Sequence, residues 1–195
     1  RTKAEGDAAL RAEFPQATIL KPSLIFGPED NFFNKFAGLA LFAPALPLIG
    51  GGHTKFQPVF VGDVADAIVK CVRDPATRGK TYELGGPEIY SFKEMLEIIL
   101  RVTERKRLLV PIPFWLAYIQ AFFLQFLPNP LLTPDQVTFL KTSNVVADNA
   151  LTFKDLGIVP DSMEAILPTY LWRFRARGQY EDFAETRVSA SPETR

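Results

Sequence analysis

Residues 17–28 read Ala17-Thr18-Ile19-Leu20-Lys21-Pro22-Ser23-Leu24-Ile25-Phe26-Gly27-Pro28. The part up to Phe26 is a short, mainly apolar run, with Pro15 before it and a Gly-Pro turn after it. Such runs between chain breakers are typical of parallel strands that are buried on both faces. The run therefore predicts an interior parallel strand over Ala17–Phe26, with Pro22 near its end.

Helical and extended patterns alternate around this run. We expect helices over residues 2–13, 31–41, 63–73 and 91–104, and short strands over residues 57–61 and 80–84. Asp63 is expected to cap the third of these helices, because its carboxylate can accept from the free N–H groups of the first turn. Ser91 with Glu94 forms a capping-box pattern at the fourth. The alternation predicts an α/β fold with a parallel sheet.

The chain after Val110 is expected to be mainly helical, with a terminal helix over Met163–Arg177. No charged residue occurs from Leu108 to Pro134, and prolines fence the apolar segment 114–127 on both sides. That segment is shorter than the ~20 residues of a membrane-spanning helix. Two interpretations remain open: a helix packed in the core, or a helix lying on a membrane surface or against a membrane-bound partner.

Composition excludes some classes of function. The 195 residues include 22 Lys and Arg against 22 Asp and Glu, so no overall positive field favours nucleic acid. The single Cys71 cannot form an internal disulfide, and no cluster of cysteine and histidine indicates a metal site. His53 is the only histidine and lies beside three glycines, where a solvated loop is expected. We therefore expect neither nucleic-acid nor metal binding.

The opening Arg1-Thr2-Lys3-Ala4-Glu5-Gly6, followed by Lys21–Pro28, resembles the later part of extended, epimerase-like short-chain dehydrogenases/reductases. The resemblance implies the C-terminal part of a Rossmann-like, doubly wound parallel fold with a mainly helical cap. Lys3 would match the helical lysine that shares the catalytic and cofactor site with a tyrosine, whose place lies before Arg1. The ammonium stabilises the phenolate of such a tyrosine. Pro22, Ser23, Leu24 and Ile25 would line the nicotinamide of NADP or NAD.

Two further blocks sharpen the resemblance, Gln57-Pro58-Val59-Phe60-Val61-Gly62-Asp63-Val64 and Asp155-Leu156-Gly157-Ile158. In their order and spacing the blocks are similar to the alpha-subcomplex subunit 9 family of respiratory complex I and its bacterial relatives. This implies a tightly held nicotinamide dinucleotide and a structural or regulatory role near a membrane complex. The implied location is the bacterial cytoplasm or the mitochondrial matrix side, beside the inner membrane. Phe56 stands where related epimerases carry an arginine for substrate phosphate, which argues against a nucleotide sugar.

An alternative interpretation is an active NAD(P)-dependent epimerase/dehydratase or reductase that acts on a small or lipidic substrate. Under either interpretation we expect residues 1–107 to supply late strands and helices of the dinucleotide-binding domain, with inserted cap elements. Residues 108–180 would form a mainly helical substrate or partner region, and residues 181–195 a disordered tail. The sequence contains no glycine-rich phosphate loop, so this chain alone is expected to bind NADPH weakly or not at all.

Overall fold

The computed structural model describes the backbone of residues 2–126, 130 and 132–176, and the side chains of these residues from Glu5 onward. The helices are α1 (Thr2–Glu13), α2 (Phe33–Phe42), α3 (Val61–Arg73), α4 (Phe92–Val102), α5 (Phe114–Leu124), α6 (Pro134–Phe139) and α7 (Met163–Leu171). The strands are β1 (Ile19–Pro22), β2 (Ile25–Phe26), β3 (Ala45–Ile49), β4 (Lys55–Phe56), β5 (Val59–Phe60), β6 (Thr81–Leu84), β7 (Tyr90–Ser91) and β8 (Leu108–Ile112). The tail expected over residues 181–195 lies outside the described residues.

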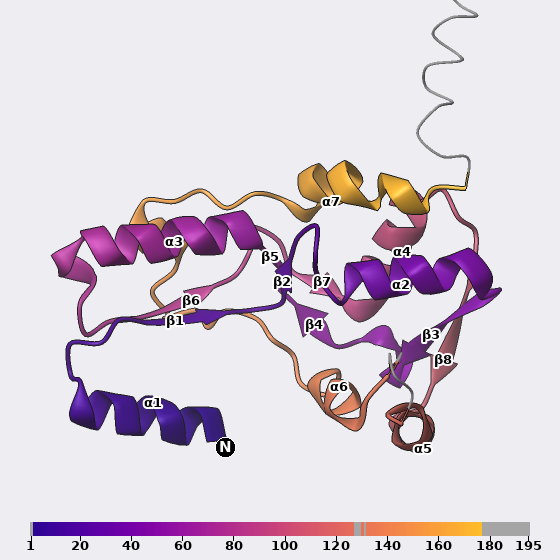
Figure 1. Ribbon diagram of the computed structural model, residues 1–195, viewed down its shortest axis with the longest axis horizontal. Coiled ribbons are helices and arrows are strands. Elements are labelled where there is room, and N and C mark those ends of the chain that lie inside the picture. The colour runs from indigo at the N-terminus through magenta and orange to yellow at the C-terminus, as the bar shows by residue number, and fades with distance from the viewer. Residues whose placement is uncertain (1, 127–129, 131, 177–195) are drawn as a thin grey trace, which may run out of the picture.

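The strands form parallel pairs, which confirms the predicted α/β class. β1 pairs with β6, β2 with β5, and β3 with β8, all in parallel, whereas β4 and β7 are antiparallel. Figure 1 shows the β1–β6 pair between α3 on one side and α1 on the other. In space the carboxyl ends of β1 and β6 lead toward β2 and β5, because Ser23 N–H donates to the Leu84 carbonyl and Val59 N–H to the Leu24 carbonyl.

The prediction of one continuous strand over Ala17–Phe26 is wrong, whereas its parallel pairing is confirmed. The segment is two short strands, and within the described residues each has a partner along one edge only. Pro22 ends β1, where its ring offers no N–H for a further ladder bond. The chain then shifts from pairing with β6 to pairing with β5, so the apolar run is split at Ser23 and Leu24.

Two helix starts differ in how well the sequence predicts them. The Ser91–Glu94 capping box of α4 is confirmed, since each side chain bonds the other residue's backbone N–H. The prediction that Asp63 caps α3 is wrong, because the helix begins two residues earlier, at Val61. Asp63 is buried in the first turn, and its carboxylate accepts from the backbone N–H of Asp161 at 2.9 Å. Burial raises the pKa of Asp63, against the lowering effect of that hydrogen bond.

The segment after residue 107 begins with a strand, and the elements described after this strand are helical, in line with the mainly helical expectation. β8 runs parallel to β3 over five residue pairs, from Ala45 with Leu108 to Ile49 with Ile112. Farther on, the predicted terminal helix is shorter than expected: α7 ends at Leu171 and a 3₁₀ turn follows it. The division of the chain at residue 107 stays a prediction, with the β3–β8 pair joining its two sides.

Buried side chains form two clusters that position the rest. The larger lies among α2, α4 and α7 and is rich in phenylalanine, including Phe26, Phe33 and Phe92. The rings of Phe26 and Phe33 meet edge to face at 5.7 Å between centroids, an arrangement that aromatic pairs favour. In the smaller cluster, Ala67 of α3 packs with Leu84 of β6. Together the clusters hold the ends of β1 and β2 in place between them.

Candidate functional site

The residues predicted to line the nicotinamide, Pro22–Ile25, lie where the paired strands end. Ser23 is the best anchored of them: its N–H donates to the Leu84 carbonyl at 2.9 Å and its Oγ to the Asn144 carbonyl at 2.7 Å. The Leu24 carbonyl accepts from Val59 N–H at 2.9 Å. The backbone of this segment is therefore fixed from three sides by chain that is distant in sequence.

Helix α1 runs antiparallel to β1. Arg11 of α1 bonds the Thr81 hydroxyl, which lies opposite the start of β1, whereas Asp7 forms an ion pair of 2.6 Å with Lys21 near the end of β1. Moving toward the amino end of α1 therefore means moving toward Pro22. Lys3 occupies the next turn of the helix beyond Asp7, ~6 Å farther along its axis. Its side chain lies outside the described residues, so only the position of its backbone is known.

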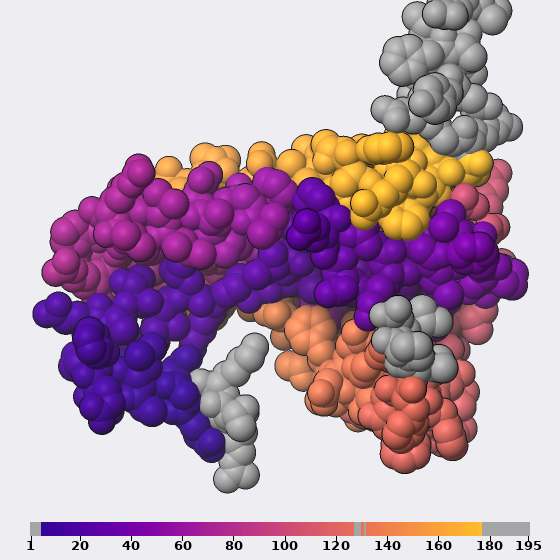
Figure 2. Space-filling view, viewed as in Figure 1, coloured from indigo at the N-terminus to yellow at the C-terminus, as the bar shows by residue number. Residues whose placement is uncertain are grey.

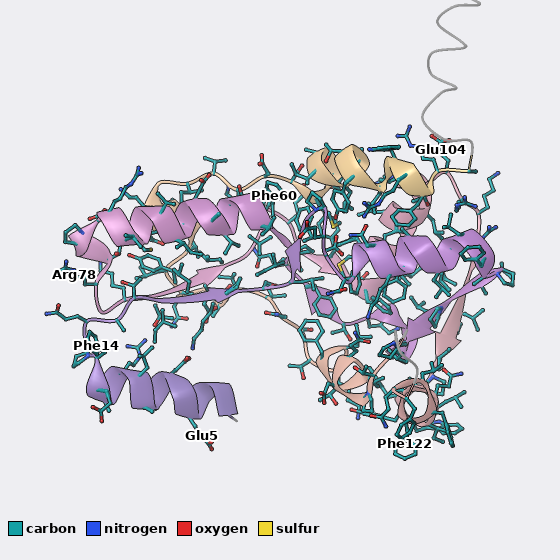
Figure 3. All side chains as sticks on the ribbon, viewed as in Figure 1. Glu5, Phe14, Phe60, Arg78, Glu104 and Phe122 are labelled. Carbon is teal, nitrogen blue, oxygen red and sulfur yellow. The ribbon has the colours of Figure 1, made fainter. Side chains whose placement is uncertain are left out.

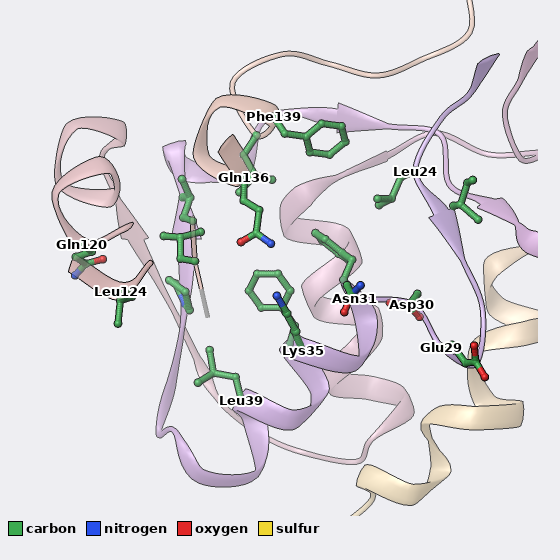
Figure 4. A pocket seen from close by; sticks show the side chains of 17 residues that line it. Leu24, Glu29, Asp30, Asn31, Lys35, Leu39, Gln120, Leu124, Gln136 and Phe139 are labelled. Atoms are coloured by element: carbon green, nitrogen blue, oxygen red, sulfur yellow. The ribbon is translucent and has the colours of Figure 1, made fainter. Parts of the chain in front are cut away.

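An apolar cavity opens beside the same strand ends. It has a volume of about 520 Å³ and is enclosed by β2, α2, β3, α5 and α6, with Leu24 and Ile25 on one wall. Figure 4 shows side chains of these elements converging on it, including Leu39 of α2 and Phe139 of α6. The volume falls within the ~300–1,000 Å³ of ordinary small-molecule sites. Of the residues predicted for the site, two thus also face a cavity that could hold a ligand.

The polar residues of the cavity wall are Glu29, Asp30, Asn31, Lys35, Gln120 and Gln136. Lys35 of α2 is half-buried and its Nζ donates to the Pro130 carbonyl at 3.3 Å. Within the described part of the chain it forms no ion pair. Gln120 of α5 and Gln136 of α6 add two amides. The wall therefore offers hydrogen-bond donors against an apolar background.

Asp30, also at the wall, serves a structural purpose. Its carboxylate accepts from the backbone N–H groups of Phe33 and Asn34 at the start of α2, and from the Tyr170 hydroxyl of α7 at 2.8 Å. Asp30 therefore stabilises the start of α2 and ties it to α7. Burial raises the pKa of Asp30 above 3.8, and the hydrogen bonds from Tyr170 and the backbone oppose this rise. The same burial, with the neighbouring carboxylate, raises the pKa of Tyr170.

We expect Asp30→Asn to change how the free energy of unfolding depends on pH. A folded-state pKa above 3.8 means that the stability contributed by the protonated carboxyl is present below 3.8 and is lost as the pH rises through the folded pKa. The amide of this variant would keep an acceptor for Tyr170 but cannot ionise. The difference in unfolding free energy, variant minus wild type, should therefore increase with pH across that window in urea titrations.

Asp74 provides the control for this measurement. It is half-buried, and a hydrogen bond from Ala76 N–H lowers the pKa of its carboxyl, with the bond to Lys70 adding to the effect. Asp74→Asn should therefore show a small difference of the opposite slope. A wild-type minus Asp30→Asn difference that is constant with pH would contradict the raised pKa.

The other candidate residues do not join the site. His53 is exposed in its loop next to Gly52, as expected. On β4, Lys55 is exposed and Phe56 is buried, so the lysine cannot replace the arginine that epimerases carry at position 56. No group of residues that could hold a metal ion occurs in the described part of the chain.

Helix α5 presents a second, separate surface. Ala117 and Ala121 are buried, whereas Trp115, Ile119, Phe122 and Phe123 are exposed, as is Phe126 just beyond the helix. Figure 3 shows Phe122 pointing away from the rest of the protein. We call the exposed side chains of Trp115, Ile119, Phe122, Phe123 and Phe126 the α5 face. None of the described helices has the length and apolar character needed to cross a bilayer.

The burial of α5 tests one of the two interpretations of segment 114–127. The core interpretation is wrong for the outer side of the helix, where Phe123 is 68% exposed and Phe126 75%. Ala117 and Ala121 are buried and Phe114 and Tyr118 pack partly against the core, so only the outer side of the helix is left exposed.

The chain is similar to curated proteins over most of its length. It is 39% identical over 188 residues to the mitochondrial NADH dehydrogenase [ubiquinone] 1 alpha subcomplex subunit 9 of Arabidopsis thaliana, covering 91% of this chain and 47% of that protein. It is 36% identical over 166 residues to the protein of the same name from Mus musculus, covering 84% and 44%. The chain thus spans about half the length of these relatives. No family model matches it.

Solved structures share the fold. The dTDP-glucose 4,6-dehydratase of Bacillus anthracis, solved in complex with NAD, superposes with a TM-score of 0.57 at 16% identity. The superposition covers 86% of this chain and 45% of that one. Other structures with this fold are nucleotide-sugar epimerases. The likeness confirms a Rossmann-like fold of the epimerase and dehydratase type.

Two features of the site could not be predicted from a local sequence pattern: the hydrogen bond between Tyr170 and Asp30, and the cavity wall. The bond from Tyr170 to Asp30 joins residues 140 positions apart. The cavity wall draws on five elements, and Lys35 lies on α2 without any motif around it. The uncharged stretch includes α5, which contributes Gln120 and Leu124 to the wall, but it did not predict a cavity.

Proposed function

The chain belongs to the family of the alpha subcomplex subunit 9 proteins of NADH dehydrogenase (ubiquinone), and from this membership we propose that it is part of a dinucleotide-binding accessory or assembly subunit of complex I. Its role is structural or regulatory, and its position is beside the membrane. The α5 face is the observation that carries this proposal, because a catalytic role would not require five exposed apolar side chains on one helix.

The proposed cofactor is NADP or NAD, held at Pro22–Ile25 with Lys3 near its ribose. The anchored backbone at Ser23 supports this, since a rigid strand end can present fixed groups to a nicotinamide ring. The direction of α1, which brings the position of Lys3 toward the same strand end, supports it as well. Figure 2 shows the surface hollowed between α1 and the α5–α6 segment. A related fold has been solved with NAD bound.

The proposed partner is a membrane surface, or the membrane-embedded part of the complex. Burying four of the exposed aromatic or aliphatic side chains of the α5 face would stabilise association by ~6–12 kcal/mol before ordering costs. The curated relatives are named as mitochondrial proteins, which supports the matrix side of the inner membrane, or the cytoplasmic side in a bacterium. No nucleic-acid partner is proposed for a chain with balanced charge.

A second candidate function is an epimerase/dehydratase or reductase reaction on a small or lipidic substrate. The apolar cavity beside Leu24 and Ile25 favours it, because a substrate held there would lie next to the proposed nicotinamide position. The two functions differ in turnover: an accessory subunit would keep its dinucleotide through purification without consuming it.

Affinity purification of the complete protein tests the proposal. We expect it to co-purify with complex I and to carry a bound nicotinamide dinucleotide. In Lys3→Ala the affinity for NADPH should fall by about 10–100-fold, the effect of losing one hydrogen bond from a charged donor. His53→Ala, which alters an exposed loop, should leave both readouts unchanged. Purification without complex I would refute the accessory role, and an unchanged NADPH affinity in Lys3→Ala would refute the cofactor site.

A further inference from the structure

The cavity described above has an apolar body and a polar region at one place in its wall. Its apolar side chains come from every enclosing element and include Leu39, Ile49, Leu124, Leu132 and Phe139. Transfer of apolar surface from water into such a cavity is favourable in proportion to the area removed. The body of a ligand that fits this cavity is therefore aliphatic or aromatic.

The polar region is centred on Lys35. An ammonium has three donors, and in Lys35 one of them bonds the Pro130 carbonyl. Gln136 uses its Oε1 to accept from Thr133 N–H at 3.1 Å, which leaves its NH₂ group available. Figure 4 shows the side chains of Lys35 and Gln136 extending into the cavity toward each other. Converging donors without a carboxylate partner fit an anionic oxygen of a ligand.

The two carboxylates at the wall do not neutralise this ammonium. Asp30 is held by the Tyr170 hydroxyl and the backbone N–H groups at the start of α2. Glu29 is exposed, and Figure 4 shows it pointing away from the cavity on the side opposite Gln120. Neither carboxylate forms an ion pair with Lys35. The negative charge that would complete the site is therefore one that a ligand brings.

We propose that this cavity binds one single-chain anionic amphiphile, with its aliphatic chain among α2, β3, α5 and α6 and its carboxylate or phosphate at Lys35. A volume of about 520 Å³ suits one chain better than two. The ligand is a free fatty acid if the head is a carboxylate, or a lysophospholipid taken from a membrane if it is a phosphate. This site adjoins the proposed dinucleotide position, with which it shares Leu24 and Ile25, and it does not depend on the role in complex I.

Binding of a series of saturated fatty acids to the complete protein, measured by calorimetry, tests the aliphatic part. Affinity should tighten about fourfold for each added methylene until the cavity is full, and then stop increasing. Lysophosphatidic acid of matched chain length forms the second arm, and the tighter of the two ligands identifies the head group. Leu39→Trp, which fills part of the cavity, should shorten the longest chain that still gains affinity.

Lys35→Met tests the head group, because it removes the charge and keeps an unbranched apolar stem. Palmitate binding should weaken by about 10–100-fold, whereas hexadecanol, which has the same chain without the charge, should bind as it does to the wild type. Lys154→Met makes the same change at an exposed lysine and should alter neither ligand. Failure of the wild type to bind either amphiphile would overturn the proposal, as would a Lys35→Met variant with unchanged preference for palmitate over hexadecanol. If Lys35→Met does not fold, a Leu39→Trp variant with the wild-type chain-length profile would overturn it.

Discussion

Phe123→Asp is expected to abolish association with membranes or with complex I while leaving the fold intact, and Ala121→Asp is expected to unfold the protein. The two positions lie two residues apart on α5, which places them on opposite sides of the helix. Phe123 is 68% exposed and Ala121 is fully buried. The same new carboxylate therefore enters water at one position and the core at the other.

The size of each effect follows from burial. An unpaired carboxylate in the core costs about 3–5 kcal/mol, a large part of the ~5–15 kcal/mol that stabilises an ordinary domain. At Phe123 the exposed carboxylate costs the fold little, but it places a charge at the centre of the α5 face. Burying that charge in an apolar partner would remove much of the ~6–12 kcal/mol available for association.

Thermal unfolding and co-sedimentation with phosphatidylcholine vesicles separate the two variants, with affinity purification of complex I as the second association test. A clear fall in the melting temperature of Phe123→Asp would contradict an exposed α5 face. Absence of the wild-type complete protein from both the vesicle pellet and purified complex I would contradict the proposed docking role of that face.

Local signals in the sequence predicted much of the secondary structure. The Ser91–Glu94 capping box could be recognised because the two residues that bond one another are three positions apart. The helix over α1 and the strand of β6 follow from patterns within a dozen residues. The uncharged stretch also predicted that α5 is unusual, although not which side of it is buried.

Features that depend on contacts between residues far apart in the chain could not be predicted from the sequence. β8 contains Pro111 and carries no alternating pattern, and it is a strand because β3 pairs with it across more than fifty residues. Asp63 was predicted to be a cap because it stands at the start of a helical pattern. Its actual partner, the N–H of Asp161, lies 98 residues away and could not be predicted from that pattern. The proposed roles of Lys3 and Pro22–Ile25 came from a family resemblance, and the structure adds the anchoring of the strand end, the direction of α1 and the cavity beside Leu24 and Ile25.

Gly86→Ala is expected to destabilise the protein strongly through a contact that the sequence conceals. A Cβ at this position would lie 2.0 Å from the carbonyl oxygen of Pro58, which is backbone and cannot rotate away. Gly86 follows β6, and its carbonyl accepts from Gln57 Nε2 at 2.8 Å. Forcing the two backbones apart should cost about 2–4 kcal/mol, which corresponds to a fall in melting temperature of about 5–15 °C.

Two other glycines serve as controls for Gly86→Ala. At Gly157 a Cβ would meet no atom within 4 Å, but its φ of +70° makes alanine strained, so Gly157→Ala should cost only about 1 kcal/mol. At Gly6, inside α1 and also in open space, alanine should stabilise by about 0.5–1 kcal/mol. A Gly86→Ala variant no less stable than Gly157→Ala would show that β6 and Pro58 separate easily.

The effect of Gly86→Ala should extend to the proposed dinucleotide site. Gln57 links Gly86 to the backbone N–H of Val146, and the nearby Asn144 carbonyl accepts from Ser23 Oγ. Displacing Gly86 would therefore shift Gln57 and the nearby Asn144 carbonyl, which accepts the hydrogen bond from Ser23 Oγ. We expect NADPH affinity of the complete protein to fall in Gly86→Ala at temperatures where the variant is still folded, and to be unchanged in Gly157→Ala. Equal NADPH affinity in the two variants would contradict the claim that the hydrogen bonds of Gln57 and Asn144 position Ser23 for the dinucleotide.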